Sequence, residues 1–319
     1  MRKKGARRGS RTPPLSLLHT AARLYYEADL SQQDVASRLG VSPATVSRML
    51  RRARALDIVR IEVRELAQPE ELAGELAGAL ALVRVAVVEA MGGARSPLGE
   101  PVGRMLTTID WGPGSALALG WGRTVHDVVG AGLPPLPGAV LVPAVGGLQE
   151  LAAYFQVNEI VRVAAGFSGA TPRFLHAPAL PSAALRDSLR RDADPGGVLE
   201  LWDGLSAAVV GVGSPPAQLG DYGPSFVVPE YPRLRDAAGD VLSHYFDVAG
   251  HPVTYPDEGR LLALSREQLH RTPLVIGVAA GRAKAPAIVG AVRAGLINAL
   301  VTEATTAEAM LALLDRRRT

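Results

Sequence analysis

The sequence predicts an α/β protein with two parts: a small N-terminal helix-turn-helix of the winged type and a larger domain built on a doubly wound parallel sheet. The first part is predicted by the spacing of small, turn and apolar residues over 31–54. The second is predicted by strand-like and helix-like stretches that alternate from about residue 83 onward. With 319 residues, the chain is long enough for one large core and a small additional domain.

The stretch 31–54, SQQDVASRLGVSPATVSRMLRRAR, has the spacing of two helices joined by a short corner. Counted from Gln32, Ala36 is the fifth residue, Gly40 the ninth, Val46 the fifteenth and Met49 the eighteenth. A small residue, a turn glycine and two apolar residues at these positions are typical of a helix-turn-helix. Ala36 lets the helices cross closely, and Gly40 can adopt the left-handed conformation that ends the first helix.

The second helix of this motif has its own start signals and a polar outer face. Ser42 is placed to cap it, and Pro43 occupies its first position. Small hydroxyl side chains followed by arginines suit a helix presented to the major groove and its flanking phosphates. The predicted DNA-binding residues are Ser42, Ala44, Thr45, Ser47, Arg48, Arg51 and Arg52. An ordinary amphipathic helical hairpin is the alternative, and the agreement of caps, corner and local charge argues against it.

The flanking segments complete the first domain. A helix over 15–28 is expected to pack behind the two helices, because its apolar residues fall on one face. The alternation of apolar and charged residues over 55–63 predicts a short strand or wing. The resulting boundaries are a disordered basic tail over 1–14, a DNA-binding domain over 15–64, a linker over 65–72 and an α/β domain over 73–319.

The charge is divided along the chain. Residues 1–64 contain 14 Lys and Arg against 5 Asp and Glu, whereas the remaining residues contain 20 against 26. The balance is therefore +9 on the helix-turn-helix part and −6 on the rest. This division favours a polyanion as the partner of the first domain only.

Composition also excludes several kinds of site. The chain has no cysteine, which excludes disulfides, thiol chemistry and cysteine-based metal centres. Its six histidines are scattered without the spacing of a metal site, so no metal or other cofactor is expected. No stretch is a convincing membrane span, and the basic N-terminus lacks the apolar segment of a signal peptide. We therefore expect a cytoplasmic protein with no membrane partner.

The larger domain is expected to alternate strands and helices, and its strands are valine-rich and apolar like buried parallel strands. After a helix within 71–82, the predicted strands lie near 83–88, 115–119, 139–143, 172–176, 207–212, 274–279 and 297–301. The predicted helices lie near 98–109, 124–131, 157–166, 182–192, 283–294 and 305–316.

The loops that leave the carboxyl ends of such strands form the candidate ligand site. Residues 116–124, ALALGWGRT, combine a strand, two glycines and an arginine at a helix start, which suits a phosphate group. Similar turns occur over 142–150, 209–214 and 278–286. The last contains Lys284, the only lysine beyond Lys4. It is either a point charge for a phosphate, an amine near a carbonyl, or a surface lysine.

Three further polar residues have two interpretations each. Asn158 either caps a helix or contacts a ligand. Asp240 and Asp247 either line the pocket or face water.

Together with the helix-turn-helix, the motifs GWGRT, VPAVGG, VVGVGS, GDVLSHYFD, VAAGRAKA and GLINALVTE resemble, in this order, the SorC family of bacterial sugar-binding transcription regulators. The resemblance covers nearly the whole chain. It implies a Rossmann-like effector domain of the sugar-phosphate isomerase and deaminase type, a homodimer or homotetramer, and operator binding controlled by a sugar or sugar phosphate. The effector site it implies comprises Gly120, Gly122, Arg123, Thr124, Gly146, Gly147, Gln149, Asn158 and Lys284. The candidate loops add Trp121, Gly213 and Asp240 to the predicted effector-binding residues.

The same fold type leaves an enzyme as the alternative function. An isomerase or deaminase needs a positioned carboxylate or histidine as general base, and no acid-rich turn stands beside the predicted phosphate loops. The sequence departs from the family pattern in the proline-rich stretch 213–238 and at Ala280, where a second glycine is common. These departures affect the identity of the effector more than the fold.

Overall fold

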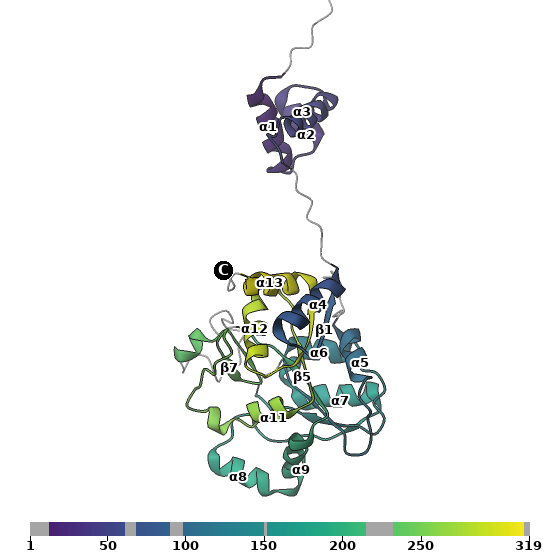
Figure 1. The fold of residues 1–319 in the computed structure, drawn as a ribbon, viewed down its shortest axis with the longest axis vertical. Coiled ribbons are helices and arrows are strands. Elements are labelled where there is room, and N and C mark those ends of the chain that lie inside the picture. Colours follow the sequence, from purple (N-terminus) through teal and green to yellow (C-terminus); the bar gives the residue numbers. More distant parts are fainter. Residues whose placement is uncertain (1–12, 61–67, 90–97, 150–151, 215–231, 316–319) are drawn as a thin grey trace, which may run out of the picture. The chain divides into compact units, whose positions relative to one another are not determined.

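The computed structural model describes residues 13–60, 68–89, 98–149, 152–214 and 232–315. The chain divides into two compact units, residues 1–66 and 67–319, which are described separately below (Figure 1). The predicted basic tail falls outside the described residues except for Pro13 and Pro14. Within the described ranges, no helix has both the length and the apolar character needed to cross a bilayer.

The first unit is a three-helix domain made of α1 (Leu15–Tyr26), α2 (Gln32–Leu39) and α3 (Pro43–Ala55). Ser31 caps α2 by accepting a hydrogen bond from the Asp34 N–H at 3.2 Å, and Gly40 ends α2 with φ of 63°. Ser42 caps α3 through the Thr45 N–H. The core is formed by buried residues of all three helices: Leu18, Ala21, Ala22, Val35, Ala36, Val46, Met49, Leu50 and Ala53. The predicted motif is confirmed in its helices, corner and caps.

The strand predicted over 55–63 is absent over its described part. Helix α3 extends to Ala55, and the N–H groups of Ile58 and Val59 bond back to the Ala53 carbonyl. Residues 56–59 therefore form a turn that packs Ile58 and Val59 partly against the helical core. Residues 61–63 lie outside the described residues.

The second unit is built on a seven-stranded, fully parallel sheet. In spatial order the strands are β1 (Arg84–Val88), β9 (Ala299–Glu303), β8 (Leu274–Val278), β5 (Ala207–Gly211), β2 (Ala116–Leu119), β3 (Val140–Pro143) and β4 (Thr171–Pro172). All seven predicted strands are confirmed. β4 covers only Thr171–Pro172 of the strand predicted near 172–176, and beyond it Asn158 hydrogen-bonds both backbone groups of Leu175 in place of a neighbouring strand.

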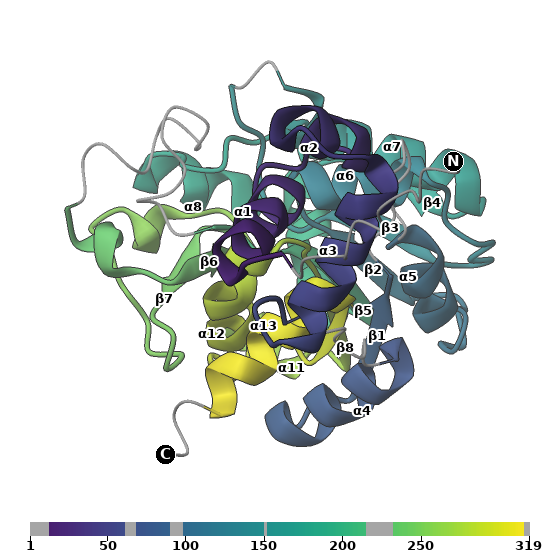
Figure 2. The same cartoon turned by 90° about the horizontal axis from the view of Figure 1, so that it is seen from above.

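Helices cover both faces of this sheet (Figures 1 and 2). One face is covered by α4 (Pro69–Leu80), α12 (Ala285–Arg293) and α13 (Ala304–Asp315), and the other by α5 (Gly99–Leu106), α6 (Arg123–Gly130) and α7 (Val157–Ser168). Within β2, Ala116 and Ala118 join the first core, whereas Leu117 and Leu119 join the second. Side chains alternate between the faces, so a strand covered on both sides is apolar throughout.

The start of α4 corrects the predicted linker. Pro69 occupies the first turn of the helix, and Gln68 and Glu71 form a capping box. Residues 69–72 of the linker predicted over 65–72 are therefore helical, while 65–67 lie outside the described residues.

The remaining elements lie in the connections. They are α8 (Ala183–Arg191), α9 (Ala193–Leu201), α11 (Arg266–Arg271), the antiparallel hairpin of β6 (Gly239–Val241) and β7 (His244–Phe246), and 3₁₀ turns at Ala153–Phe155, Trp202–Gly204, Pro232–Asp236, Glu258–Arg260 and Arg282–Lys284. The prediction found α8 but missed α9, α11 and the hairpin. α9 contains Pro195, Gly196 and Gly197, which disfavour a helix by propensity, yet it forms with Asp192 as its cap and Val198 buried.

Candidate functional site

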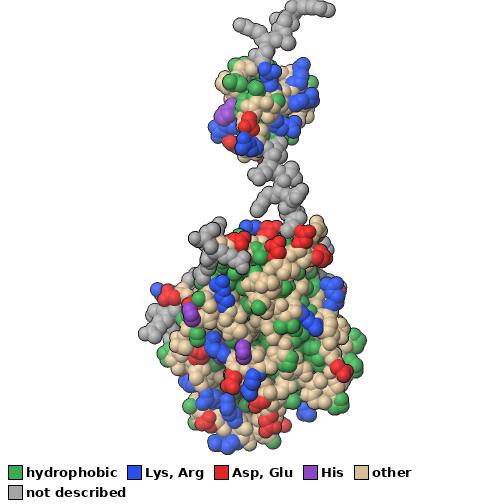
Figure 3. Space-filling view, viewed as in Figure 1, with side chains coloured by type: hydrophobic (Ala, Val, Ile, Leu, Met, Phe, Trp, Pro, Cys, Tyr) green, Lys and Arg blue, Asp and Glu red, His purple; other side chains and the backbone are tan. Residues whose placement is uncertain are grey.

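The polar face of α3 is arranged as expected for contact with DNA. Five of the predicted DNA-binding residues are exposed, namely Ser42, Ala44, Arg48, Arg51 and Arg52, and Thr45 and Ser47 are half-buried. The Arg48 guanidinium donates to the Ala44 carbonyl and to Thr45 Oγ1, each at 3.3 Å, which holds it along the start of the helix. Basic side chains predominate among the charged groups on the visible face of this unit (Figure 3).

The ligand pocket lies at the point where the strand order reverses. From β2 the chain proceeds outward through β3 and β4, whereas from β5 it proceeds the other way through β8 and β9. Loops that leave the carboxyl ends of β2 and β5 therefore diverge, and open α/β sheets bind ligands in this crevice. A cavity of about 720 Å³ occupies the position, and we call it the switch-point pocket. Its walls come from residues 121–124, 154–155 and 211–214, with Asp240, Leu242, Ser243, Ala280 and Lys284.

The loop after β2 forms one wall of the switch-point pocket and ends at the start of α6. Gly122 caps α6 with φ of 108° and ψ of 156°, a conformation that essentially only glycine adopts, and its N–H donates to the Tyr154 carbonyl at 2.7 Å. Arg123 and Thr124 open the helix, whose first backbone N–H groups have no partner within it. The start of α6 is therefore suited to an anionic group of a ligand.

Aromatic side chains form a second wall. The Arg123 guanidinium lies 5.3 Å from the centroid of the Tyr154 ring. Trp121 meets Phe155 edge-to-face with 6.2 Å between ring centroids. Tyr154 and Phe155 were not among the predicted site residues. The sequence carries a signal for them, since two adjacent aromatic residues follow the glycine turn of 142–150 in a chain with only 5% aromatic residues.

The loop after β5 contacts Asp240 of β6 and Lys284, which lies in the 3₁₀ turn after β8. Lys284 Nζ donates to the Val212 carbonyl at 2.9 Å, and the Gly213 N–H donates to the Asp240 carbonyl at 2.9 Å. A Cβ atom at residue 213 would overlap Asp240 Oδ1, so only glycine fits beside this carboxyl group. Ser243 donates its N–H to Asp240 Oδ2 at 2.9 Å.

Both ionisable groups are perturbed by their surroundings. Burial raises the pKa of Asp240, opposed by the Ser243 N–H and by the charge of Lys284. Burial lowers the pKa of Lys284, and Arg123 acts in the same direction while Asp240 opposes it. Lys284 and Asp240 thus face one cavity in which neither is fully hydrated. A ligand with both an anionic group and hydroxyl groups would supply the missing hydrogen-bond partners of the two side chains.

Of the predicted effector residues, Trp121, Gly122, Arg123, Thr124, Gly213, Asp240 and Lys284 line this pocket, and Gly120 lies directly before it. The described part of the predicted turn, residues 142–149, does not line it, and neither does Asn158. Gly146 and Gly147 donate their N–H groups to the carbonyls of Leu262 and Ala177, each at 2.8 Å, and a Cβ on Gly146 would approach Pro178 to 2.7 Å. Gly146 therefore allows close packing of two backbone segments, whereas a Cβ on Gly147 would make only ordinary contact, 3.7 Å from the Ala177 carbonyl oxygen.

The structure also shows the surroundings of the remaining polar candidates. Asn158 is not the helix cap, because Gln156 holds that position, and its amide binds the Leu175 backbone. Gln149 is exposed and precedes residues outside the described ranges. Asp247 accepts N–H groups of Ala249 and His251 in its own turn and does not line the pocket. Among the described residues, no group of three or more His, Asp or Glu side chains is placed to hold a metal ion.

Comparison with known proteins gives the same division of the chain. Residues 64–312 match the family described as "Putative sugar-binding domain", and residues 23–56 match region 4 of sigma-70 factors. The sorbitol operon regulator of Klebsiella pneumoniae is 29% identical over 310 residues, covering 93% of this chain and 98% of that protein. The transcriptional regulator LsrR of Enterobacter sp. (strain 638) is 30% identical over 319 residues, covering 93% of each chain.

A solved structure is similar over the full length. The crystal structure of the full-length sorbitol operon regulator SorC from Klebsiella pneumoniae superposes with a TM-score of 0.68 at 28% identity, covering 94% of this chain and 99% of that one. These relatives are named as regulators, which favours the regulator interpretation over the isomerase or deaminase alternative.

Proposed function

This chain belongs to the SorC family of sugar-binding transcriptional regulators, and we propose that a sugar or sugar phosphate in its switch-point pocket controls the binding of α3 to operator DNA. It is a DNA-binding regulator rather than an enzyme. One observation supports the effector part above all others: Arg123, the start of α6 and Lys284 face one cavity at the reversal of the strand order.

Residues at the start of α3 and residues one turn further along contact different parts of the DNA. Ala44, Thr45, Ser47 and Arg48 lie near the start of the helix and read base edges, while Arg51 and Arg52, one turn further on, hold phosphates. Ser42 fixes the start of the helix through its cap. One short helix buries too little surface for operator affinity, so the regulator acts as a homodimer or homotetramer on paired half-sites. Because its partner is operator DNA, the regulator acts in the cytoplasm, where that DNA lies.

The effector carries an anionic group at Arg123, Thr124 and Lys284 and a hydroxyl group at Asp240. A carboxyl oxygen of Asp240 accepts a hydrogen bond from this hydroxyl group, and the ring of Tyr154 bounds the ligand on one side. Control of DNA binding requires only that the effector favours one quaternary arrangement by a few kcal/mol, on the order of 1–3.

A comparison of Arg123→Ala with Arg48→Ala tests this proposal. Unfolding midpoints of the full chain are first measured with a series of free and phosphorylated sugars, because a ligand that binds only the folded state raises the midpoint. A hit is then added to an operator-binding assay. We expect Arg123→Ala to bind the operator normally and to lose the effector response, and Arg48→Ala to lose sequence preference while keeping the midpoint shift. Wild-type behaviour of both variants would show that the proposed contacts are wrong.

A further inference from the structure

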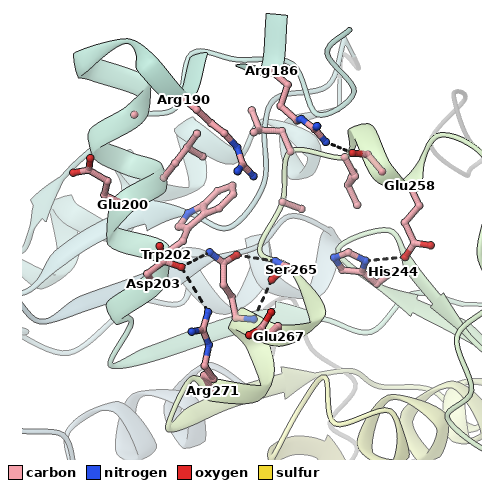
Figure 4. A pocket seen from close by; sticks show the side chains of 17 residues that line it. Arg186, Arg190, Glu200, Trp202, Asp203, His244, Glu258, Ser265, Glu267 and Arg271 are labelled. Carbon is pink, nitrogen blue, oxygen red and sulfur yellow. Dashed lines mark hydrogen bonds and ion pairs between the residues drawn. The ribbon is translucent and has the colours of Figure 1, made fainter. Parts of the chain in front are cut away.

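A second cavity lies in the effector unit and shares no lining residue with the switch-point pocket. Its volume is about 520 Å³, within the usual range for small-molecule sites. It is bounded by α8, α9, α11 and the segment 258–265. Figure 4 shows Arg190 reaching from α8 toward the space above the indole of Trp202, with Arg186 beside it. We call this the α8 cavity.

Two acidic side chains of the α8 cavity, Asp203 and Glu258, are already paired with cationic or hydrogen-bonding groups. Asp203 accepts a hydrogen bond from Gln268 at 2.8 Å and lies 3.7 Å from Arg271. Glu258 pairs with His244 at 3.1 Å and with Arg266 at 3.0 Å. In Figure 4, Glu200 points away from the Arg190 guanidinium. Glu267, at the foot of the cavity, is exposed to solvent.

The two arginines of α8 that line the cavity, Arg186 and Arg190, have unused donor capacity in contrast. Within the described part of the chain, Arg190 has neither a hydrogen bond nor an ion pair. Arg186 donates to the Gly259 carbonyl, but its buried Nε makes no hydrogen bond, and the nearest carboxylate oxygen, on Asp187, is 3.8 Å away. Residues four apart share one face of a helix, so two like charges face the same space. An anion between them would relieve this repulsion and accept the free N–H groups.

The floor of the α8 cavity indicates the chemical character of the part of the ligand that is not anionic. Trp202 is buried, and its Nε1 already donates to the Pro143 carbonyl at 2.8 Å, so only its apolar ring surface is available. We infer that the α8 cavity is a second ligand site, which binds a small organic anion through Arg186 and Arg190 with the apolar part of the ligand over Trp202. The anionic group is a carboxylate or a phosphate, the two groups whose geometry fits guanidinium donors.

Protection of arginines from phenylglyoxal tests this inference in the full chain. The protein is labelled with increasing inorganic phosphate or malonate, and each arginine is quantified by mass spectrometry. We expect labelling of Arg190 to fall several-fold with saturation by at least one of the two anions. Arg191 is the internal control, because it is exposed on the same helix and does not line the cavity.

Two variants separate this site from the switch-point pocket. Arg123→Ala should leave the protection of Arg190 unchanged, whereas a loss of protection would mean that the anion binds at the switch point and would overturn the inference. Arg190→Ala should abolish the protection of Arg186 by the same anion. Equal labelling of Arg190 and Arg191 at every concentration of both anions would equally refute a second site. Neither outcome depends on whether Arg123 binds the effector.

Discussion

Glu258 shows how one half-buried carboxylate is kept ionised. Burial opposes its charge, but the hydrogen bond with His244 and the charge of Arg266 outweigh burial and lower the pKa of Glu258. Both ring nitrogens of His244 face acceptors, Glu258 Oε1 at 3.1 Å and the Leu264 carbonyl at 2.9 Å, so both donate only when the ring is protonated. The carboxylate thus joins β7 to the segment 258–266 by charge-assisted hydrogen bonds.

Glu258→Gln is expected to lower the free energy of unfolding by about 1 kcal/mol at neutral pH, because it replaces charge-assisted hydrogen bonds by neutral ones. A carboxyl whose pKa is lowered by folding stabilises the protein above its unfolded-state pKa, and this contribution is lost as the pH falls through the folded-state pKa. The difference between wild type and variant should therefore shrink on acidification. Urea unfolding at several pH values measures it.

Glu267→Gln is the matched control for that experiment. Glu267 lies on the same cavity but is exposed, so its replacement should change the free energy of unfolding by less than about 0.5 kcal/mol at any pH. If the two variants had the same pH dependence, the stabilising role assigned to the contacts of Glu258 would be wrong.

At the level of single residues, the sequence predicted the cations and glycines of the switch-point pocket but not its aromatic wall. Arg123 and Lys284 could be predicted because they follow strands, where the loops of a parallel sheet converge. Tyr154 and Phe155 were missed although they stand out as adjacent aromatic residues, because they lie in a 3₁₀ turn that does not directly follow a strand, and the Tyr154 carbonyl meets the Gly122 N–H only in the folded chain. Gly146 and Asn158 looked like ligand contacts, because glycine and asparagine serve close backbone packing as readily as binding.

Helix caps are the features of single elements with the most direct energetic consequence. Ser42 caps α3 in the first unit and Ser182 caps α8 in the second, each by accepting the N–H of the residue three positions on, at 3.2 Å. The two serines make the same contact in separate compact units. They therefore form a matched pair.

Ser42→Ala is expected to destabilise the helix-turn-helix unit by about 1 kcal/mol, because one backbone N–H at the start of α3 loses its partner. Ser182→Ala should affect the effector unit instead. Amide hydrogen exchange of the full chain, which reports local stability, would show the loss of protection in one unit at a time. Loss of protection in both units from either change would contradict the division into two units.

The strands of the parallel sheet could be predicted from the sequence, whereas the β6–β7 hairpin could not. The apolar runs of strands buried on both faces, such as β8, have few alternative interpretations. The β6–β7 hairpin was missed because its turn uses Leu242 and Ser243 with φ of 52° and 66°, where glycine or asparagine would be the usual signal. Tertiary contacts hold these residues in the left-handed region, including the Ser243 N–H with Asp240.

The division of charge is a property of the whole molecule. Most of the positive balance lies in residues 1–64, so the affinity for DNA should come from that unit and fall with salt as counterions are released. Arg51→Ala is expected to make the slope of log Kobs against log salt less negative by about 0.9, the effect of one phosphate contact. Fluorescence anisotropy with operator DNA at several salt concentrations measures this slope.

Arg191→Ala removes the same charge from the acidic part of the chain. Because Arg191 lies on α8, its replacement should leave the slope unchanged. If both variants changed the slope equally, the effect would be one of net charge rather than of a contact made by α3.

The β6–β7 hairpin has a consequence for the effector unit as a whole. Asp240, Leu242 and Ser243 line the switch-point pocket, while His244, the next residue, lines the α8 cavity. An occupant of either cavity thus rests against the same segment, residues 240–244. If one ligand shifts that segment, thermodynamic linkage requires that each ligand alters the other's dissociation constant by the same factor. The regulator would then integrate two metabolite concentrations into a single transcriptional output.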